Sequence, residues 1–431
     1  MGGLIALLLL VCLVENWRGA RAWEAFRTEM EAKGEKLDYR EFIPKPVPDD
    51  QNFARTPLLA PMLDYDRVTP GKWRDVEGRD RAHRVSGAFS NYSGKKAPQA
   101  GSWQVGTFIE LDEWQDFLVG NTNFPGVARS TNSAADVLAT LRRFDVELLE
   151  LETASRRPHS VFPIHYEEIF YALLPHLSTI KGISSVVRLR ALARLKAGQK
   201  DQAVQDVRLT LRLAESFREE TFLISQLVRI AILQMAIHPV WEGCARHEWT
   251  DPQLVELQSA LAGIRLIEDY GRTMRGERAF NNAGMDLLIT GKMNLSDFGE
   301  DSFAPAGKVR WFVSGWIRQN QVLLCRLHQE RTIPLIDATK HRVFVGPARM
   351  AENMPELQTP GPYNILARML VPAVTKTAAK FAHGQTALDL AVTACALERY
   401  RLANGEYPPQ LDLIVPRFIE KFRPTSSTAR C

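Results

Sequence analysis

The side chains that come nearest to a metal site are His165 and Glu168. On a helix they would lie one turn apart and could share a metal ion, with His159 or His176 as a further ligand. A dinuclear site would need a second pair of this kind, and the chain has none. Nine histidines in 431 residues often produce one such pair by chance. We therefore expect no bound metal.

The other residues that could do chemistry lack a recognisable spacing. His238 and His247 flank Pro239 without the spacing of metal ligands, and Asp112 and Glu113 lie in a Trp-rich strip expected to form a surface turn. No HExxH, GxSxG, phosphate-binding or dinucleotide-binding motif occurs. We assign no catalytic residue and no cofactor. A hydrolase with two separated carboxylates stays open as an alternative, because such pairs leave no local signature.

The cysteines are few and scattered, and they form no CxxC motif or Cys/His cluster of the kind that binds zinc. They are Cys12, Cys244, Cys325, Cys395 and Cys431. One lies in the hydrophobic N-terminal run and one is the last residue. The three in between are an odd and widely spaced set, so we expect buried free thiols and no disulfide framework.

The charge pattern argues against a nucleic-acid partner. The net charge is only +4, and basic and acidic residues alternate, as they do between Glu24 and Lys36. This alternation is typical of a solvated helix face and gives no basic patch for a phosphate backbone.

The N-terminus carries an unbroken apolar run from Leu4 to Val14. It is short of the roughly 20 residues of a full membrane span, and it could also be the core of a signal peptide cleaved after Ala20–Ala22, or the remainder of a longer membrane helix. Arg18 and Arg21 disfavour cleavage, although by the positive-inside rule they draw the following chain into the cytoplasm. We expect an uncleaved single-pass anchor with an extracytoplasmic body, the orientation resting on the resemblance given below.

The sequence divides into five sections. Residues 1–34 form the hydrophobic segment and a helix that continues from it, and residues 35–132 form an irregular section rich in proline and glycine. Helical periodicity predicts an array of helices over 133–300 and a C-terminal helical part over 301–424. Residues 425–431 are expected to form a disordered tail. The predicted fold class is mainly α, a helical hairpin array behind an irregular N-terminal section.

One helical hairpin is recognisable in the array. Its turn lies at Gly198, and Ala203 follows five residues later, which is the spacing of a tetratricopeptide hairpin. Arg190 and Arg194 occupy positions that are usually apolar in that repeat, so the match is degenerate. We predict that Ala191, Gly198 and Ala203 lie where the two helices approach most closely. Helical arrays of this kind commonly bind other proteins, whereas a plain bundle presents no ligand-binding face.

Local signals place several further helix ends. A helix over 219–237 is predicted to stop before Pro239, and the next opens at Thr250 with a capping box to Gln253. The aromatic and basic segment 308–331 is interpreted as a core helix, with a helix lying on the membrane surface as the alternative.

The last long helix is predicted to begin near Thr375 and to stop at Asn404–Gly405, with Gly405 in a left-handed conformation. Tyr407 and Leu411 should then fold back onto its apolar face. The side chains expected to face the core are Leu388, Ala391, Ala394, Cys395 and Leu402.

Five stretches resemble a group of uncharacterised, single-pass membrane-anchored bacterial proteins with a helix-rich body. These stretches are residues 16–23, 52–61, 224–230, 315–321 and 394–408. The resemblance covers nearly the whole chain and implies a membrane anchor, but it implies no assigned activity. The chain departs from the group at its first residues, where no basic flank precedes the apolar run, and after Phe418.

The stretch 394–408 is also similar to the end of the long helix in type II secretion pseudopilins, which share its Tyr, its Asn-Gly stop and its Tyr-Pro exit. In a pseudopilin one helix joins this motif to the hydrophobic N-terminus, whereas here the two lie far apart in the sequence. We therefore expect a non-catalytic, membrane-anchored envelope protein that acts as a helical interaction scaffold, with the membrane and other envelope proteins as partners.

Overall fold

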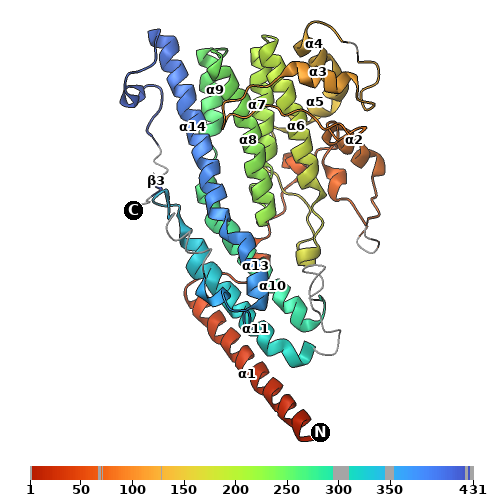
Figure 1. The fold of residues 1–431 in the computed structure, drawn as a ribbon, viewed down its shortest axis with the longest axis vertical. Helices are drawn as coiled ribbons and strands as arrows, with labels where there is room; N and C mark the ends of the chain where they lie inside the picture. Colours follow the sequence, from red (N-terminus) through yellow and green to blue (C-terminus); the bar gives the residue numbers. More distant parts are fainter. Residues whose placement is uncertain are drawn as a thin grey trace.

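The computed structural model describes residues 2–66, 69, 71–127, 129–294, 310–344, 354–422 and 426–427. The chain is mainly α-helical, as predicted. Long helices stand side by side in the upper body, and helix α1 projects from its lower end with the N-terminus at the tip (Figure 1).

The body is built from helices of nine to 28 residues, joined mostly by short turns. They are α4 (Ser133–Leu141), α5 (Asp145–Ala154), α6 (Pro175–Lys196), α7 (Lys200–Glu215), α8 (Leu223–Ala245), α9 (Asp251–Ala262), α10 (Leu266–Thr290), α11 (Arg310–Leu327), α13 (Ile365–Thr375) and α14 (Thr377–Asn404). A π-helical turn, His328–Thr332, follows α11. Three two-residue strands, β1 (Ile336–Asp337), β2 (Arg342–Val343) and β3 (Ser426–Ser427), form the described sheet.

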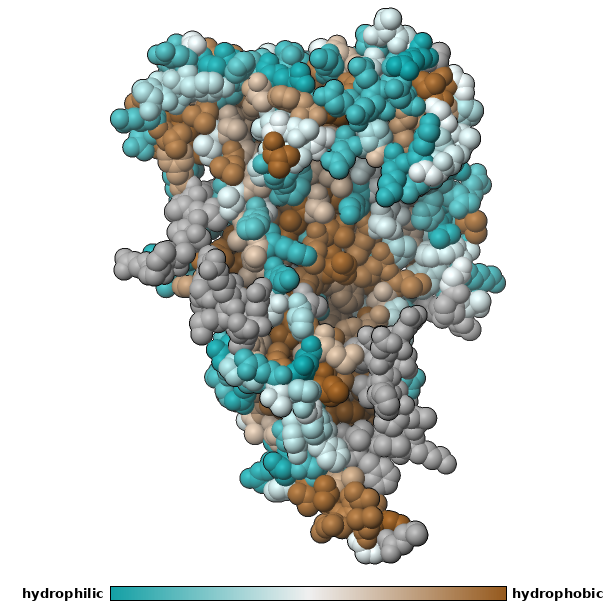
Figure 2. All heavy atoms as spheres, in the orientation of Figure 1, coloured by the Kyte–Doolittle hydropathy of each residue, from teal (hydrophilic) through white to brown (hydrophobic). Residues whose placement is uncertain are grey.

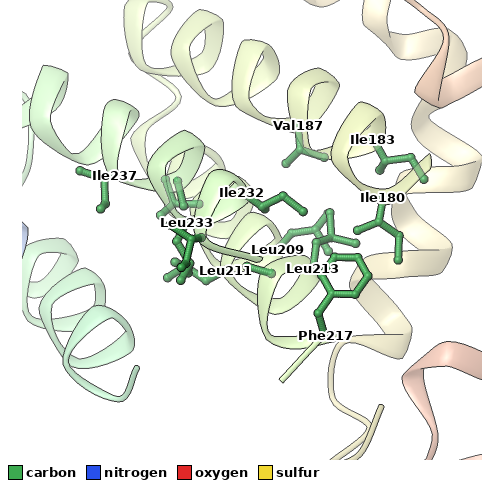
Figure 3. Packing of buried hydrophobic residues seen from close by; sticks show 14 of the residues in the cluster. Ile180, Ile183, Val187, Leu209, Leu211, Leu213, Phe217, Ile232, Leu233 and Ile237 are labelled. Atoms are coloured by element: carbon green, nitrogen blue, oxygen red, sulfur yellow. The ribbon is translucent and has the colours of Figure 1, made fainter. Parts of the chain in front are cut away.

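The core of the upper body lies between α6, α7 and α8. These helices contribute aliphatic side chains at helical spacing, with Phe217 at the edge (Figure 3). The labelled members Ile180, Ile183, Val187, Leu209, Leu213, Ile232 and Leu233 are at most 2% exposed. Burial of apolar area on this scale is the main favourable term for folding, so this core fixes the positions of the surrounding helices.

The predicted hairpin is α6 and α7, which break at Ala197–Gln199 as expected. Ala191 and Ala203 are fully buried. The prediction for Gly198 was wrong, because its φ is +75° and no atom lies within 4 Å of where a Cβ would stand. Gly198 serves the left-handed turn, which a Cβ disfavours, and not the contact between the helices.

The section 35–132 is more ordered than predicted. Two α-helices, α2 (Val76–Ser86) and α3 (Leu111–Val119), interrupt it. Between α1 and α2 the chain also forms short 3₁₀ turns, which are η1 (Tyr39–Phe42), η2 (Asp49–Gln51), η3 (Phe53–Arg55) and η4 (Ala60–Leu63). Both α-helices are short and pack on later helices, so tertiary contacts stabilise them where local periodicity is weak.

Predicted helix boundaries hold where a cap is present. Thr250 and Gln253 form the predicted capping box at α9, and Gly405 ends α14 with φ +86°. The boundary at Pro239 was wrong, because α8 continues through it to Ala245. A proline inside a helix loses one backbone hydrogen bond and clashes with the preceding turn. Here, the buried packing around Pro239 offsets that cost.

The C-terminal helix buries part of the predicted face. Leu388, Ala391 and Cys395 are buried and Ala394 is half-buried, whereas Leu402 is 42% exposed. Leu411 is exposed as well, so the predicted return of that residue was wrong. The residues that fold back instead are Ile414 and Phe418, which pack with Ala396 in a separate small cluster.

The predicted disordered tail lies mostly outside the described residues. Its described part, Ser426–Ser427, pairs in parallel with Arg342–Val343 of β2. The predicted division at residue 300 also falls outside the described residues.

Candidate functional site

The residues that were weighed as possible metal ligands, His165, Glu168, His159 and His176, lie in separate surroundings. His165 precedes η6 (Tyr166–Tyr171), a 3₁₀ segment that is kinked at Ile169, so His165 and Glu168 are not on successive turns of an α-helix. The ring of His165 lies edge-on to Tyr65, with centroids 5.2 Å apart. The carboxylate that lies near the ring is that of Glu167, with its Oε1 3.7 Å from Nδ1 of His165.

The two further histidines lie in other surroundings. His176 is fully buried on α6, and its Nε2 is 2.9 Å from Oε1 of Glu220. His159 is exposed, and its main-chain oxygen accepts a hydrogen bond from Phe53 N. Among the described residues, no group of three or more His, Cys, Asp or Glu side chains could hold a metal ion.

The other candidate residues have structural partners. His238 is buried next to Gly101, whose missing side chain leaves room for the ring. His247 lies 3.0 Å from Glu398 on α14. Asp112 and Glu113 lie in the first turn of α3 and not in a surface turn, where negative charge favours the helix N-terminus.

The groups with strongly shifted pKa values lie inside the core. Burial lowers the pKa of His328 to about 3 and raises that of Cys325 to about 12. Burial also raises the pKa of Tyr270 well above its usual value. None of the three lines an open cleft described here. A catalytic acid or base is expected where a shifted group meets a cleft.

Helix α1 (Gly2–Ala32) has two unlike halves. The side chains from Leu4 to Val14 are largely exposed, up to 66% at Leu4, and they form the apolar tip of the molecule (Figure 2). The helix is long and apolar enough to cross a membrane. Helix α8 passes the same test but is mostly buried in the core, so the exposed half of α1 is the surface that differs from the rest.

The second half of α1 runs parallel to α11 and touches it at two glycines. A Cβ on Gly19 would lie 2.7 Å from Gly315 Cα, too close for any side chain. Beside this contact, Asn16 Oδ1 accepts hydrogen bonds from Gly315 N at 2.8 Å and from Ser314 Oγ at 2.9 Å. We call these four residues the glycine crossing. Small residues allow the backbones to approach, and the Asn16 bonds fix the register.

A second contact holds the chain just beyond α1. Glu35 accepts hydrogen bonds from Arg278 at 2.8 Å, from Arg275 at 3.1 Å and from Gln329 at 3.1 Å. Burial raises the pKa of Glu35, but these three bonds outweigh burial and the net pKa is lowered. Arg278 is itself fully buried and also donates to Lys36 O. We call Glu35, Arg275, Arg278 and Gln329 the anchor clasp.

A long groove follows the outer face of α7. It consists of a cleft of about 630 Å³ beside α5 and α9 and a second of about 430 Å³ beside Pro44–Val47 and Pro158–Val161. Arg212 and Glu215 line both clefts and therefore join them. We call this the α7 groove. Its apolar floor is formed by Leu209, Leu211, Ala260 and Ile264.

The acidic residues of the α7 groove are already paired with arginines of the body. Glu152 pairs with Arg190, Glu215 with Arg229, and Glu219 with Arg272, at 2.6 to 2.8 Å.

The groove also has exposed basic groups without such a partner. Arg156 lies in one cleft and Lys45 in the other, and neither forms an ion pair with any residue described here. Arg212 is occupied by main-chain oxygens of Ser155, Arg157 and His159. The groove therefore presents free positive charge in both of its clefts.

The sequence analysis located the apolar half of α1 but missed the anchor clasp and the α7 groove. Glu35, Arg156 and Lys45 stand in segments without periodicity, and nothing local marks them.

Comparison of the chain with protein-family models, curated proteins and solved structures finds no match.

Proposed function

We propose that this protein is a membrane-anchored, non-catalytic scaffold whose α7 groove binds an extended acidic segment of another envelope protein. The observation that carries the membrane attachment is α1, a helix with one exposed apolar half and one half packed on the body. The body lies outside the cytoplasm in this proposal.

The packing of α1 supports an uncleaved anchor. Cleavage after Ala22 would remove Asn16 and Gly19, and with them the whole glycine crossing to α11. Exposed apolar side chains cost free energy in water, and a bilayer removes that cost for Leu4 to Val14. A signal peptide has no need for interhelical hydrogen bonds to the mature body.

The charges of the α7 groove support an acidic partner. Its carboxylates are neutralised from within the body, whereas Arg156 and Lys45 remain exposed and unpaired among the described residues. Complementary charge steers association and fixes the register of a bound segment. The length of the groove across two joined clefts suits an extended chain better than a compact small molecule.

The anchor is tested by fractionation of cells that express the full chain. The wild-type protein should stay in the membrane pellet after a carbonate wash, and a variant with Leu8→Arg and Leu10→Arg should leave it, because charge in the bilayer is costly. A soluble wild-type protein with a new N-terminus near Trp23 would contradict the anchor.

The groove is tested with a fluorescent hexaglutamate peptide and the full chain in detergent. Arg156→Glu with Lys45→Glu should weaken binding by roughly tenfold, and added salt should weaken wild-type binding, because both charges are exposed. The matched control is Lys376→Glu with Arg342→Glu, which makes the same change at exposed sites outside the groove. If both double variants bound the peptide equally weakly, the attraction would be unspecific and the proposal that the α7 groove binds an acidic segment would be wrong.

A further inference from the structure

Two cysteines that are far apart in the sequence meet between α8 and α14. Cys244 is 8% exposed and Cys395 is fully buried. The two thiols are close enough to interact, and the Cys395 thiol raises the pKa of Cys244. From the sequence we expected the cysteines of the body to be buried free thiols. Their spacing gave no sign that two of them meet, so this contact is a product of the fold alone.

The two helices are held in register on both sides of the thiols. Three residues further along the chain in each case, just past the end of α8 and on α14, Nδ1 of His247 lies 3.0 Å from Oε1 of Glu398. Towards the other end, Gly384 packs against Ile230, whose Cγ2 would lie 3.2 Å from an added Cβ. The helices therefore run parallel here, with Cys244 and Cys395 at matching positions.

The other described cysteines cannot compete for this contact. Cys325 is buried with Phe26 and Met30 at the anchor end of the molecule, and Cys12 lies in the apolar half of α1. A disulfide requires two closely spaced Cβ atoms that face each other. Within the described chain, such a meeting of cysteines occurs at Cys244 and Cys395.

We propose that Cys244 and Cys395 form a redox-active pair that closes to a disulfide between α8 and α14 when the chain folds in the presence of a disulfide oxidant. One cysteine thiolate attacks the oxidant disulfide and releases one thiol. The second cysteine then attacks the mixed disulfide and releases the other. In total the two protein thiols lose two protons and two electrons, and the oxidant disulfide becomes two thiols.

The burial of the pair sets when the reaction occurs. The thiolate is the reactive form, and the neighbouring Cys395 thiol together with burial raises the pKa of Cys244. The bridge therefore forms while α14 docks on α8, when the two thiols are already close but still open to the oxidant, and the packed helices protect it from reductants afterwards.

The test refolds the full chain in detergent with oxidised and reduced glutathione, then counts thiols in denaturant with a maleimide of high mass. The sequence has five cysteines. The bridged protein should bind two fewer labels before reduction than after it, and a peptide joining the two helices should be lighter by two hydrogen atoms. The bridged protein should also melt several degrees higher than the reduced protein, because the bridge restricts the unfolded chain.

Three variants make the test specific. Cys244→Ser and Cys395→Ser should each abolish the difference in labelling, and Cys325→Ser, equally buried, should retain it. Equal labelling of the wild-type protein before and after reduction would refute the pair. So would a bridge to another cysteine, or a glutathione adduct on each cysteine without a bridge.

Discussion

The α6–α7 hairpin and the junction of α1 with the body are both held by buried ion pairs, but the two pairs differ in range. In the hairpin, Asp206 accepts a hydrogen bond from Arg190 at 2.5 Å and forms an ion pair with Arg194 at 2.8 Å, and the residues are at most 16 positions apart. In the anchor clasp, Glu35 and Arg278 are 243 positions apart.

Because of this difference, the hairpin can form early in folding from neighbouring segments, whereas the junction of α1 with the body can form only late. The hairpin can form its polar contacts as soon as two adjacent helices meet, and its apolar core reinforces them. The clasp and the glycine crossing need α10 and α11 in place before α1 can dock. We therefore expect changes at the junction to release α1 while leaving the hairpin folded.

The largest expected effect is at Arg278. Its replacement by Ala leaves Glu35 without its most buried partner and removes a fully buried side chain, so the free energy of unfolding should fall by about 3–5 kcal/mol. Arg275→Ala is the matched control, because it bonds the same carboxylate from a more exposed position, and should cost about 1 kcal/mol or less. Equal losses in denaturant titrations would show that burial does not distinguish the two arginines.

The second effect is a dependence on pH. His328 has a pKa of about 3 in the folded chain, below the ordinary 6.5, because burial disfavours its charged form. The unfolded chain therefore binds a proton that the folded chain does not, and stability is lost as the pH falls from about 6.5 towards 3, by about 1.4 kcal/mol per pH unit.

His328→Leu should flatten this dependence between about pH 6 and 5. Glu35 has a lowered pKa and loses its contribution only below its ordinary value of 4.5, so it does not interfere there. If the free energy of unfolding of the variant changed with pH as steeply as that of the wild type, His328 would not be the source of the dependence.

The third effect separates the junction from the hairpin. Gly19→Leu cannot keep the backbone contact with Gly315, and it should cost about 1–3 kcal/mol and open α1 to limited proteolysis. Gly3→Leu is the control, because nothing lies within 4 Å of its Cβ position. If Gly19→Leu also unfolded the hairpin, the two regions would not be independent.

The fourth effect lies in the hairpin itself. Ala203 is fully buried between the helices, so Ala203→Leu should overpack the contact and cost about 1–3 kcal/mol. The exposed neighbour Gln202 gives the control, Gln202→Leu. The melting temperature of the first variant should fall while α1 stays protected from protease.

The smallest effect is at the end of α14. Gly405 has φ +86°, and Gly405→Val should cost about 1 kcal/mol or more through backbone strain. Gly405→Asn should cost less, because Asn tolerates this conformation. Calorimetry of the two variants should rank them in that order.

The sequence by itself determined the features that depend on near neighbours. The capping box at Thr250, the left-handed stop at Gly405 and the hairpin turn at Gly198 each satisfy or strain backbone groups a few residues away. The apolar half of α1 was equally visible, because a continuous run of large apolar residues needs no partner to be recognised.

The predictions that failed also rested on near neighbours, and there the tertiary packing overruled the local preference. Pro239 marks a helix end by local preference, but the packing of α8 in the core carries the helix through it. Leu402 has the expected spacing, yet it lies in the last turn of α14 and is left exposed. Leu411, beyond the end of α14, is exposed as well. Periodicity gives the face of a helix, and only the neighbouring elements decide how far that face is covered.

The clasp, the groove and the thiol pair were decided by the tertiary structure alone. Each brings together side chains from distant segments, as Glu35 meets Arg278 and Cys244 meets Cys395. No local rule links such residues, because their proximity follows from the packing of long helices between them. The sequence determined that the chain has an apolar N-terminal helix and a helical body, and the packing of the helices determined how one is joined to the other.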